Sequence, residues 1–239
     1  MKLYMSKQHG AWAMLVVPFV LGMVAGGFDW LQIVLAIGWV PLYLSTYPLV
    51  QAIKKKKVKF HMTWFYRYFF TAIVFIIPVV VMRPSIGFVG LLMIPFFLLN
   101  IYFGIRNKDR YFWNDISAII AFSLSSIATY MLGANQINTL AWLIVGVSVL
   151  FFVGSTFFVK TVLREKKNQK FRWLSWIYHS LVPLAFLVIG KWLIALAFLP
   201  SLIRAIGGPR IPMRPMKMGI LEIVNALIFF IVMSIHFYS

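Results

Sequence analysis

Acidic side chains are scarce in this sequence, so each can be considered individually for chemistry. The five acids are Asp29, Asp109, Asp115, Glu165 and Glu222. In MGILEIVNALIFF, Glu222 and Asn225 are three residues apart and share one face of an otherwise apolar helix. Ionisable groups at membrane depth are costly and usually face a cavity or a partner. The sequence therefore predicts a polar site around Glu222, or an ion pair with Arg204 or a loop arginine.

The other acids have simpler interpretations. Asp29, in GGFDWL, is expected in a solvated turn, and Asp109, in RNKDR, is expected to balance neighbouring loop charges. Asp115 directly follows Asn114 at a predicted helix start, where an Asx side chain accepts hydrogen bonds from free amides. Helix capping or ligand binding would both explain these two residues.

A basic stripe is predicted in FVKTVLREKKNQKFR, residues 158–172. Lys160, Arg164 and Lys167 recur at i, i+4 and i+7, so one helical face carries all three. Such a stripe can hold a phosphate group. It can also contact anionic lipid headgroups, at about 1 kcal/mol per basic residue near the surface.

The histidines do not predict a metal site, because His9, His61, His179 and His236 lack the close spacing of zinc ligands. His9, in KQHGAWAM, is expected as an interfacial residue or a ligand contact. His179 is expected to line a polar cavity or to bond a backbone carbonyl. The chain has no cysteine, and no catalytic triad, Walker loop or dinucleotide fingerprint can be assembled. No catalytic residue, metal or cofactor is therefore assigned.

Composition identifies the structural class that must position these side chains. The chain is 62% hydrophobic and 12% charged, far from the balance of a soluble domain. A bilayer core of about 30 Å needs roughly 17 to 25 apolar residues per helix. We therefore predict an all-α transmembrane bundle forming one domain over residues 1–239, with eight spans as the alternative to nine. The expected spans are 11–27, 31–52, 68–82, 86–103, 115–133, 139–159, 174–189, 192–206 and 218–236.

The basic residues predict the orientation of this bundle. With nine spans, all 23 lysines and arginines except Arg83 and Lys191 fall on the same side as the amino terminus. Short cytoplasmic loops retain positive charge, so we expect a multi-pass protein of the bacterial cytoplasmic membrane with its amino terminus inside. The net charge of +18 does not indicate nucleic-acid binding, because the basic residues lie in short connectors between apolar runs.

Several sequence motifs resemble those of one family of bacterial membrane proteins. They are KQHGAWAM, TYP at residues 46–48, PFFLLNIYF from Pro95, NDISAIIAFSL from Asn114, FVKTVLREKKN from Phe158, PSLIRAI from Pro200 and PMKMGILEIVN from Pro215. Together they cover nearly the whole chain and resemble the YwiC-like family. That resemblance implies a membrane protein and no particular activity.

The layout is also similar, more remotely, to the UbiA superfamily of intramembrane prenyltransferases. That resemblance, carried by NIYFGIRNKDRYFWNDISAIIAFSL, implies nine spans and a site at the cytoplasmic ends of spans two and six. Enzymes of the superfamily hold magnesium there with two aspartate-rich motifs. Here the corresponding stretches read YPLVQAIKKKK and FVKTVLREKK, so magnesium-assisted chemistry is not expected.

Three functions are compatible with these patterns. The first is a UbiA-like bundle that binds or processes an isoprenoid or other anionic lipid, with Lys54, Arg106, Lys160 and Arg164 contacting phosphate directly. The second is a small permease in which Asn100, His179, Glu222 and Asn225 line a path, and the third is a structural subunit without a pocket. The candidate binding residues are Lys7, His9, Tyr47, Lys54, Asn100, Arg106, Asn114, Asp115, Lys160, Arg164, Arg204, Glu222 and Asn225.

Overall fold

The computed structural model describes residue 4 and residues 10–54, 57–210 and 215–238. Within these ranges the chain forms nine α-helices and one 3-10 turn, without a β-strand. The helices are α1 (Gly10–Gly26), α2 (Trp30–Ile53), α3 (Val58–Met82), α4 (Ser85–Ile105), α5 (Phe112–Ala134), α6 (Thr139–Leu163), α7 (Gln169–Val188), α8 (Trp192–Gly207) and α9 (Pro215–Tyr238). The 3-10 turn is η1 (Gly208–Arg210). The expected all-α class is confirmed.

Six of the helices, α2 to α6 and α9, are long and apolar enough to cross a membrane. This property supports a multi-pass membrane protein. Several helices also continue past the apolar runs expected from the sequence. The largest difference is in α3, which begins at Val58 whereas the expected span begins at residue 68. The extension, VKFHMTWFYR, mixes polar and aromatic residues, so a criterion based on apolar length excludes it although its backbone is helical.

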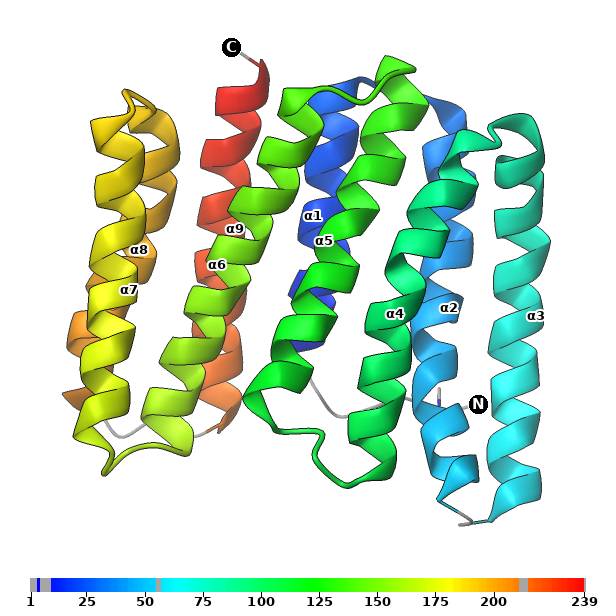
Figure 1. The fold of residues 1–239 in the computed structure, drawn as a ribbon, viewed down its shortest axis with the longest axis horizontal. Coiled ribbons are helices and arrows are strands. Elements are labelled where there is room, and N and C mark those ends of the chain that lie inside the picture. The colour runs from blue at the N-terminus through cyan, green and yellow to red at the C-terminus, as the bar shows by residue number, and fades with distance from the viewer. Residues whose placement is uncertain (1–3, 5–9, 55–56, 211–214, 239) are drawn as a thin grey trace.

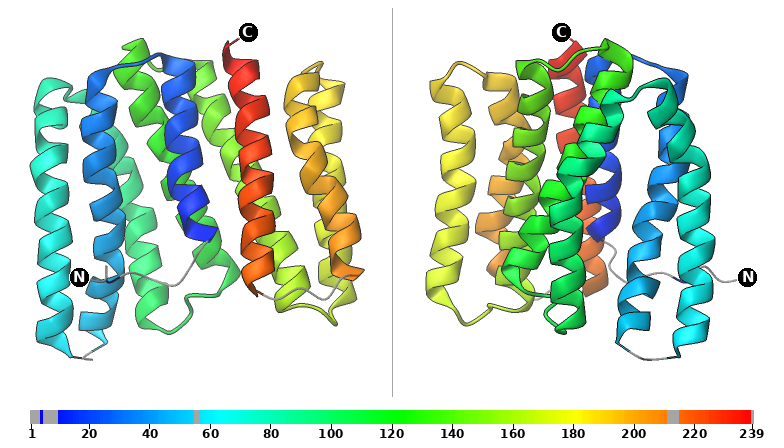
Figure 2. Two further views of the ribbon diagram at one scale, coloured as in Figure 1. Left: turned by 180° about the vertical axis from the view of Figure 1, so that it is seen from behind. Right: turned by 45° about the vertical axis from the view of Figure 1, so that its right-hand side comes forward.

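Successive helices alternate in direction because the described connectors between them are short (Figure 1). Helices α1 and α5 pack together in the middle of the bundle. The α2–α3 hairpin lies at one side and the α7–α8 hairpin at the other, as both views in Figure 2 show. The connectors containing Arg83 and Lys191 lie at one end of the bundle. We call the opposite end, where α2, α4, α6 and α8 finish, the basic end.

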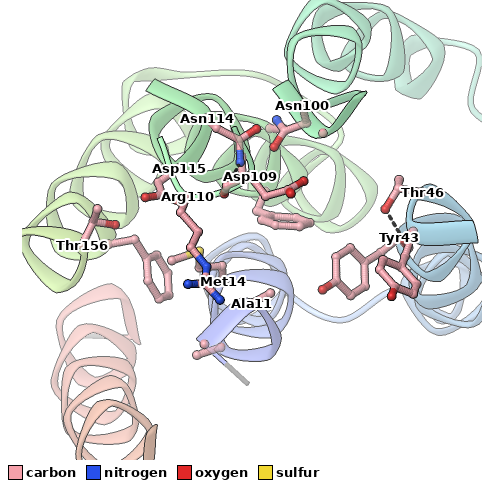
Figure 3. A pocket seen from close by; sticks show the side chains of 18 of the residues that line it. Ala11, Met14, Tyr43, Thr46, Asn100, Asp109, Arg110, Asn114, Asp115 and Thr156 are labelled. Atoms are coloured by element: carbon pink, nitrogen blue, oxygen red, sulfur yellow. Dashed lines mark hydrogen bonds between the residues drawn. The ribbon is translucent and has the colours of Figure 1, made fainter. Parts of the chain in front are cut away.

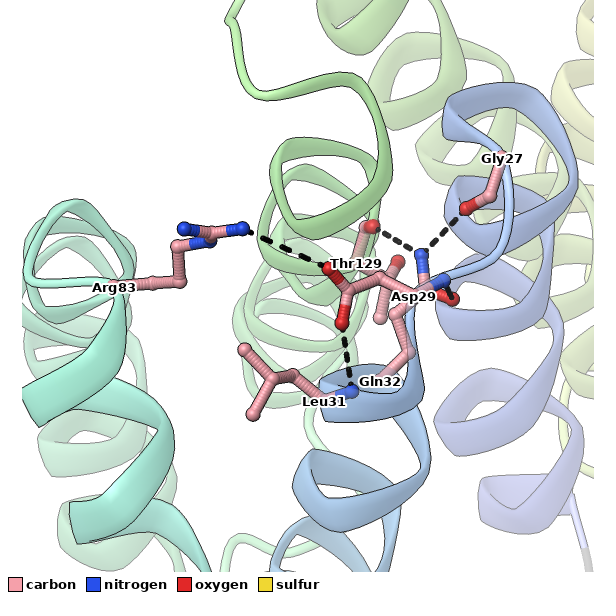
Figure 4. A network of polar contacts seen from close by, with 6 residues as sticks. All are labelled: Gly27, Asp29, Leu31, Gln32, Arg83 and Thr129. Atoms are coloured by element: carbon pink, nitrogen blue, oxygen red, sulfur yellow. Dashed lines mark hydrogen bonds and ion pairs between the residues drawn. The ribbon is translucent and has the colours of Figure 1, made fainter.

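A polar network fixes the turn between α1 and α2 against α5 (Figure 4). Asp29 caps α2 by accepting a 2.8 Å hydrogen bond from the Leu31 amide, and it pairs with Arg83 at 3.8 Å. Gln32 completes the capping box by accepting from the Asp29 amide at 3.0 Å. Its Nε2 donates to the carbonyls of Gly27 and Thr129. Asp29 thus has a structural role in its turn.

Small residues let α1 and α5 approach closely. A Cβ added at Gly22 would collide with the Thr129 hydroxyl and with the backbone carbonyl of Ser126. The same Thr129 hydroxyl donates a 2.8 Å hydrogen bond to the Phe19 carbonyl. Small side chains and interhelical hydrogen bonds are typical of helix contacts in membranes, where lipid is as apolar as the protein core.

Replacing Gly22 with alanine is therefore expected to destabilise the fold. Because the backbone carbonyl of Ser126 cannot move freely, we expect a loss of about 2 kcal/mol in the free energy of unfolding. Gly146→Ala is the matched control, since a Cβ at Gly146 in α6 meets no atom within 4 Å. It should be neutral or stabilising by up to about 1 kcal/mol. Thermal unfolding of both variants in detergent, followed by tryptophan fluorescence, measures the difference. Equal stability of the two would contradict close α1–α5 packing.

Candidate functional site

A cavity of about 560 Å³ opens among α1, α2, α4, α5, α6 and α9 (Figure 3). Its lining comes only from the halves of these helices nearest the basic end, and from the α4–α5 loop. Its size falls within the range of about 300–1,000 Å³ typical of small-molecule sites. The deeper walls are largely apolar, with Met14, Leu44, Phe97, Phe122 and Phe152 among the lining side chains.

The α4–α5 loop forms the polar rim of the cavity, and cations from α6 hold it in place. Lys160 donates a 2.7 Å hydrogen bond to the backbone carbonyl of Arg110 and pairs with Asp115 at 2.9 Å. Arg164, one turn later, donates to the same carbonyl at 3.2 Å. The end of α6 is thereby joined to the loop and to the start of α5.

The other side of the loop is held by α2. Lys54, at the carboxyl end of α2, pairs with Asp109 at 3.9 Å. Asn114 donates a 2.9 Å hydrogen bond to the Asp109 carbonyl, which keeps the loop against the start of α5. A Cβ at Gly104 would lie 3.0 Å from the Val50 side chain, so α4 and α2 are already in close contact beneath this loop.

Basic side chains outnumber acidic ones around the cavity. Three of the five acids in the chain, Asp109, Asp115 and Glu222, line it. Each has one basic partner, in Lys54, Lys160 and Arg204 respectively. Two further cations also line the cavity, Arg110 and Arg164, and neither forms an ion pair with a described carboxylate. Figure 3 shows Arg110 reaching from the loop toward Ala11 and Met14 of α1.

A buried polar group forms the cavity wall where α6, α8 and α9 meet. Glu222 pairs with Arg204, and the two residues are only 9% and 8% exposed. Arg204 also donates a 3.1 Å hydrogen bond to the Ser155 hydroxyl, and its guanidinium lies 4.6 Å from the centre of the Phe158 ring. Of this group, Glu222 and Ser155 line the cavity.

Comparison with known proteins identifies the family. The model of the YwiC-like protein family matches residues 5–130. The uncharacterized protein YwiC of Bacillus subtilis is 42% identical over 237 residues, which cover 98% of both chains. The chain belongs to the YwiC-like family. An uncharacterized protein of Haemophilus influenzae is 35% identical over 235 residues, covering 98% of this chain and 99% of that protein. No solved structure matches, so the likeness to the UbiA superfamily stays a prediction.

The structure of this YwiC-like protein brings many of the predicted binding residues to one cavity. Those that line it are Tyr47, Asn100, Asn114, Asp115, Lys160, Arg164 and Glu222. Lys54 and Arg204 lie behind them as ion-pair partners. Asn225 is buried against Ser201, to which it donates at 3.0 Å. Arg106 is exposed over the Tyr102 ring and does not line the cavity, and Lys7 and His9 lie outside the described residues.

Other lining residues were not selected from the sequence. Asp109 was interpreted as a loop charge, and Arg110, Ser155 and Thr156 were not singled out, although all four line the cavity. Lys160 and Arg164, which donate to the Arg110 carbonyl, lie 50 and 54 positions away along the chain, and Lys54, the ion-pair partner of Asp109, is similarly distant in sequence, so local patterns carry no signal for these contacts. His179, the alternative cavity residue, instead places Nδ1 2.7 Å from the Ser175 carbonyl. Among the described residues, no group of three potential metal ligands occurs.

The Lys160–Asp115 pair is expected to stabilise the fold measurably. Lys160→Met leaves Asp115 without its partner and the Arg110 carbonyl without its shorter hydrogen bond. We expect a loss of about 2 kcal/mol in the free energy of unfolding, and a similar loss for Asp115→Asn. The double variant should lose less than the sum of the two single variants.

Thermal unfolding of the three variants in detergent provides this double-mutant cycle. Lys167→Met is the control, because Lys167 is exposed just after the same helix and should change stability by less than about 0.5 kcal/mol. Strictly additive losses would show that the two side chains are not coupled.

Proposed function

We propose that this protein binds an amphiphilic anionic ligand, a phosphorylated isoprenoid or another anionic lipid, in the cavity at its basic end. The observation that carries this proposal is the combination of apolar walls with two guanidinium groups, Arg110 and Arg164, that form no ion pair with a described carboxylate. Apolar walls suit a hydrocarbon chain. Guanidinium groups suit a phosphate, because their donors match its oxygens in pairs.

The contacts of the lysines favour these arginines as the phosphate ligands. Lys54 and Lys160 were also expected to contact phosphate, but each is already paired with an aspartate. A new anion would have to compete with those carboxylates. Arg164 donates only to a backbone carbonyl, and its side chain is exposed, so it can turn toward a ligand at less cost.

The same pairs argue for binding without magnesium. A magnesium-bridged diphosphate needs carboxylates that are free to coordinate the ion. Asp109 and Asp115 each contact a lysine ammonium group, which already compensates their charge. We therefore propose direct contact between the protein and the phosphate, and we assign no catalytic residue.

The permease alternative receives less support from the geometry. It requires polar groups that are reachable from both membrane faces and helices interrupted near the midplane. The helices are continuous across the described residues, and the cavity lining comes only from the half nearest the basic end. His179 and Asn225, both expected along such a path, are not among the lining residues. A structural subunit without a pocket is likewise not favoured, because a cavity is present.

Binding of farnesyl phosphate tests the proposal. The wild-type protein in phosphatidylcholine nanodiscs should bind farnesyl phosphate and should bind farnesol much more weakly. The double variant R110Q/R164Q should lower the affinity for farnesyl phosphate about thirtyfold, equivalent to about 2 kcal/mol from two charge-assisted hydrogen bonds. Microscale thermophoresis measures both affinities.

R106Q is the matched control, since Arg106 is an exposed arginine beside the same loop and outside the cavity lining. It should leave the affinity unchanged. An equal loss in R106Q would indicate non-specific attraction to a basic surface, and equal binding of farnesol would remove the role of phosphate. Phosphatidic acid as a third probe distinguishes an isoprenoid site from a general site for anionic lipids.

We further propose that the basic end faces the cytoplasm and that the protein resides in the bacterial cytoplasmic membrane. Because the chain contains no cysteine, single-cysteine variants can report orientation without background labelling. Lys108→Cys lies in the α4–α5 loop and Gln136→Cys in the connector at the opposite end, and both positions are exposed. An impermeant maleimide should label Gln136→Cys in intact cells and Lys108→Cys only after permeabilisation. The reverse pattern would invert the proposed topology.

A further inference from the structure

The cavity has a second polar region, separate from the loop and its arginines. Ser155, Thr156 and Glu222 line it from α6 and α9, and Figure 3 shows Thr156 on the cavity side of α6. Ser155 lies in α6, nine residues before Arg164, which caps the carboxyl end of that helix. At about 1.5 Å per residue, the two positions are about 13 Å apart along the helix axis. A ligand with its phosphate at Arg164 would therefore place the far part of its chain near Ser155.

The hydrogen bonds of this region leave groups available to a ligand. The Ser155 oxygen accepts from Arg204 at 3.1 Å, and this is its only hydrogen bond to a described residue. Its own proton is therefore free to be donated. Glu222 pairs with Arg204 through one carboxylate oxygen, and the residue faces the cavity. Ser155 and Thr156 thus present two hydroxyl groups, and Glu222 presents one carboxylate acceptor, to the cavity from neighbouring helices.

The charge balance decides which chemical group fits. Arg204 compensates Glu222, so the region is neutral overall, and an additional ammonium or carboxylate would be buried without a partner. A neutral hydroxyl can both donate to a carboxylate and accept from a serine, and so satisfies both groups. A purely structural role, in which the Arg204–Glu222 pair only joins α8 to α9, would not require Glu222 to line the cavity. Asn225 and Ser201 already bond across these two helices, behind the wall.

We propose that Ser155, Thr156 and Glu222 form an inner subsite for a neutral hydroxyl group carried on the far end of the ligand's chain. This inference rests on the proposed function, since it assumes that an anionic headgroup lies at Arg110 and Arg164. It extends that function by assigning the ligand class as amphiphiles with a phosphate at one end and a hydroxyl toward the other.

Two probes that differ in one group test the subsite. Dodecyl phosphate and ω-hydroxydodecyl phosphate have the same headgroup and chain length. The wild-type protein in nanodiscs should bind the hydroxylated probe about tenfold more tightly, as expected for a buried hydrogen bond to a charged acceptor. Without the subsite, the hydroxyl would be buried unpaired and the order of affinities would reverse.

Substitutions test whether these residues cause the preference for the hydroxylated probe. Ser155→Ala and Thr156→Val should each reduce the ratio of the two affinities toward one, with little effect on dodecyl phosphate. Ser148→Ala is the matched control, because Ser148 is buried on the same helix two turns earlier and does not line the cavity. It should retain the full ratio. Glu222→Gln, which keeps the shape of the side chain, should lower the ratio if the variant folds, and thermal unfolding checks this.

The outcomes separate this inference from the proposed function. Tight binding of both probes with equal affinity would overturn the inner subsite and leave the anionic-lipid site intact. A preference that survives in Ser155→Ala and Thr156→Val would also overturn it, because the hydroxyl would then bind elsewhere. Failure of wild type to bind either probe would overturn both proposals.

Discussion

The paired ammonium group of Lys160 is the interaction on which the geometry of the basic end depends. The residue is only 7% exposed, and a charge so deeply placed is tolerated only with partners. Its two partners, Asp115 and the Arg110 carbonyl, belong to the start of α5 and to the α4–α5 loop. These contacts therefore join the end of α6 to both segments. The ion pair and the hydrogen bond of Lys160 thus hold the rim of the cavity in place.

This pairing also divides the many cations of the chain into two groups with different roles. Lys54, Lys160 and Arg204 neutralise the three acids that line the cavity and so hold its walls together. Arg110 and Arg164 line the same cavity, and within the described part of the chain neither forms an ion pair with a carboxylate. The basic residues of the chain would by themselves indicate only its orientation in the membrane. At the cavity, however, Arg110 and Arg164 add positive charge beyond the three ion pairs. Lipid headgroups and the proposed ligand would both be attracted to it.

Hydropathy alone was sufficient for the fold class and for the approximate position of each helix, because every helix contains an apolar run, and in six helices that run is long enough to cross a bilayer. It misplaced the start of α3 by ten residues, since helical backbone continues beyond the apolar part of that segment. Site residues on helices, such as Asn100 and Glu222, were recognisable as polar groups in apolar surroundings. Asp109 and Arg110 were not, because their roles arise from contacts with α2 and α6 that only the folded chain creates.

The charge balance of the cavity would also limit the proposed ligand. Three acid–base pairs cancel, and the guanidinium groups of Arg110 and Arg164 are left without an ion pair to a described carboxylate. A phosphate monoester carries about 1.5 to 2 negative charges near neutral pH, which matches this excess. A diphosphate would add negative charge, and among the described residues it could gain the Lys160 ammonium only by displacing Asp115, which would release the loop that forms the rim. If the cavity binds the proposed ligand, the contacts that build it would favour a monophosphate headgroup over a diphosphate.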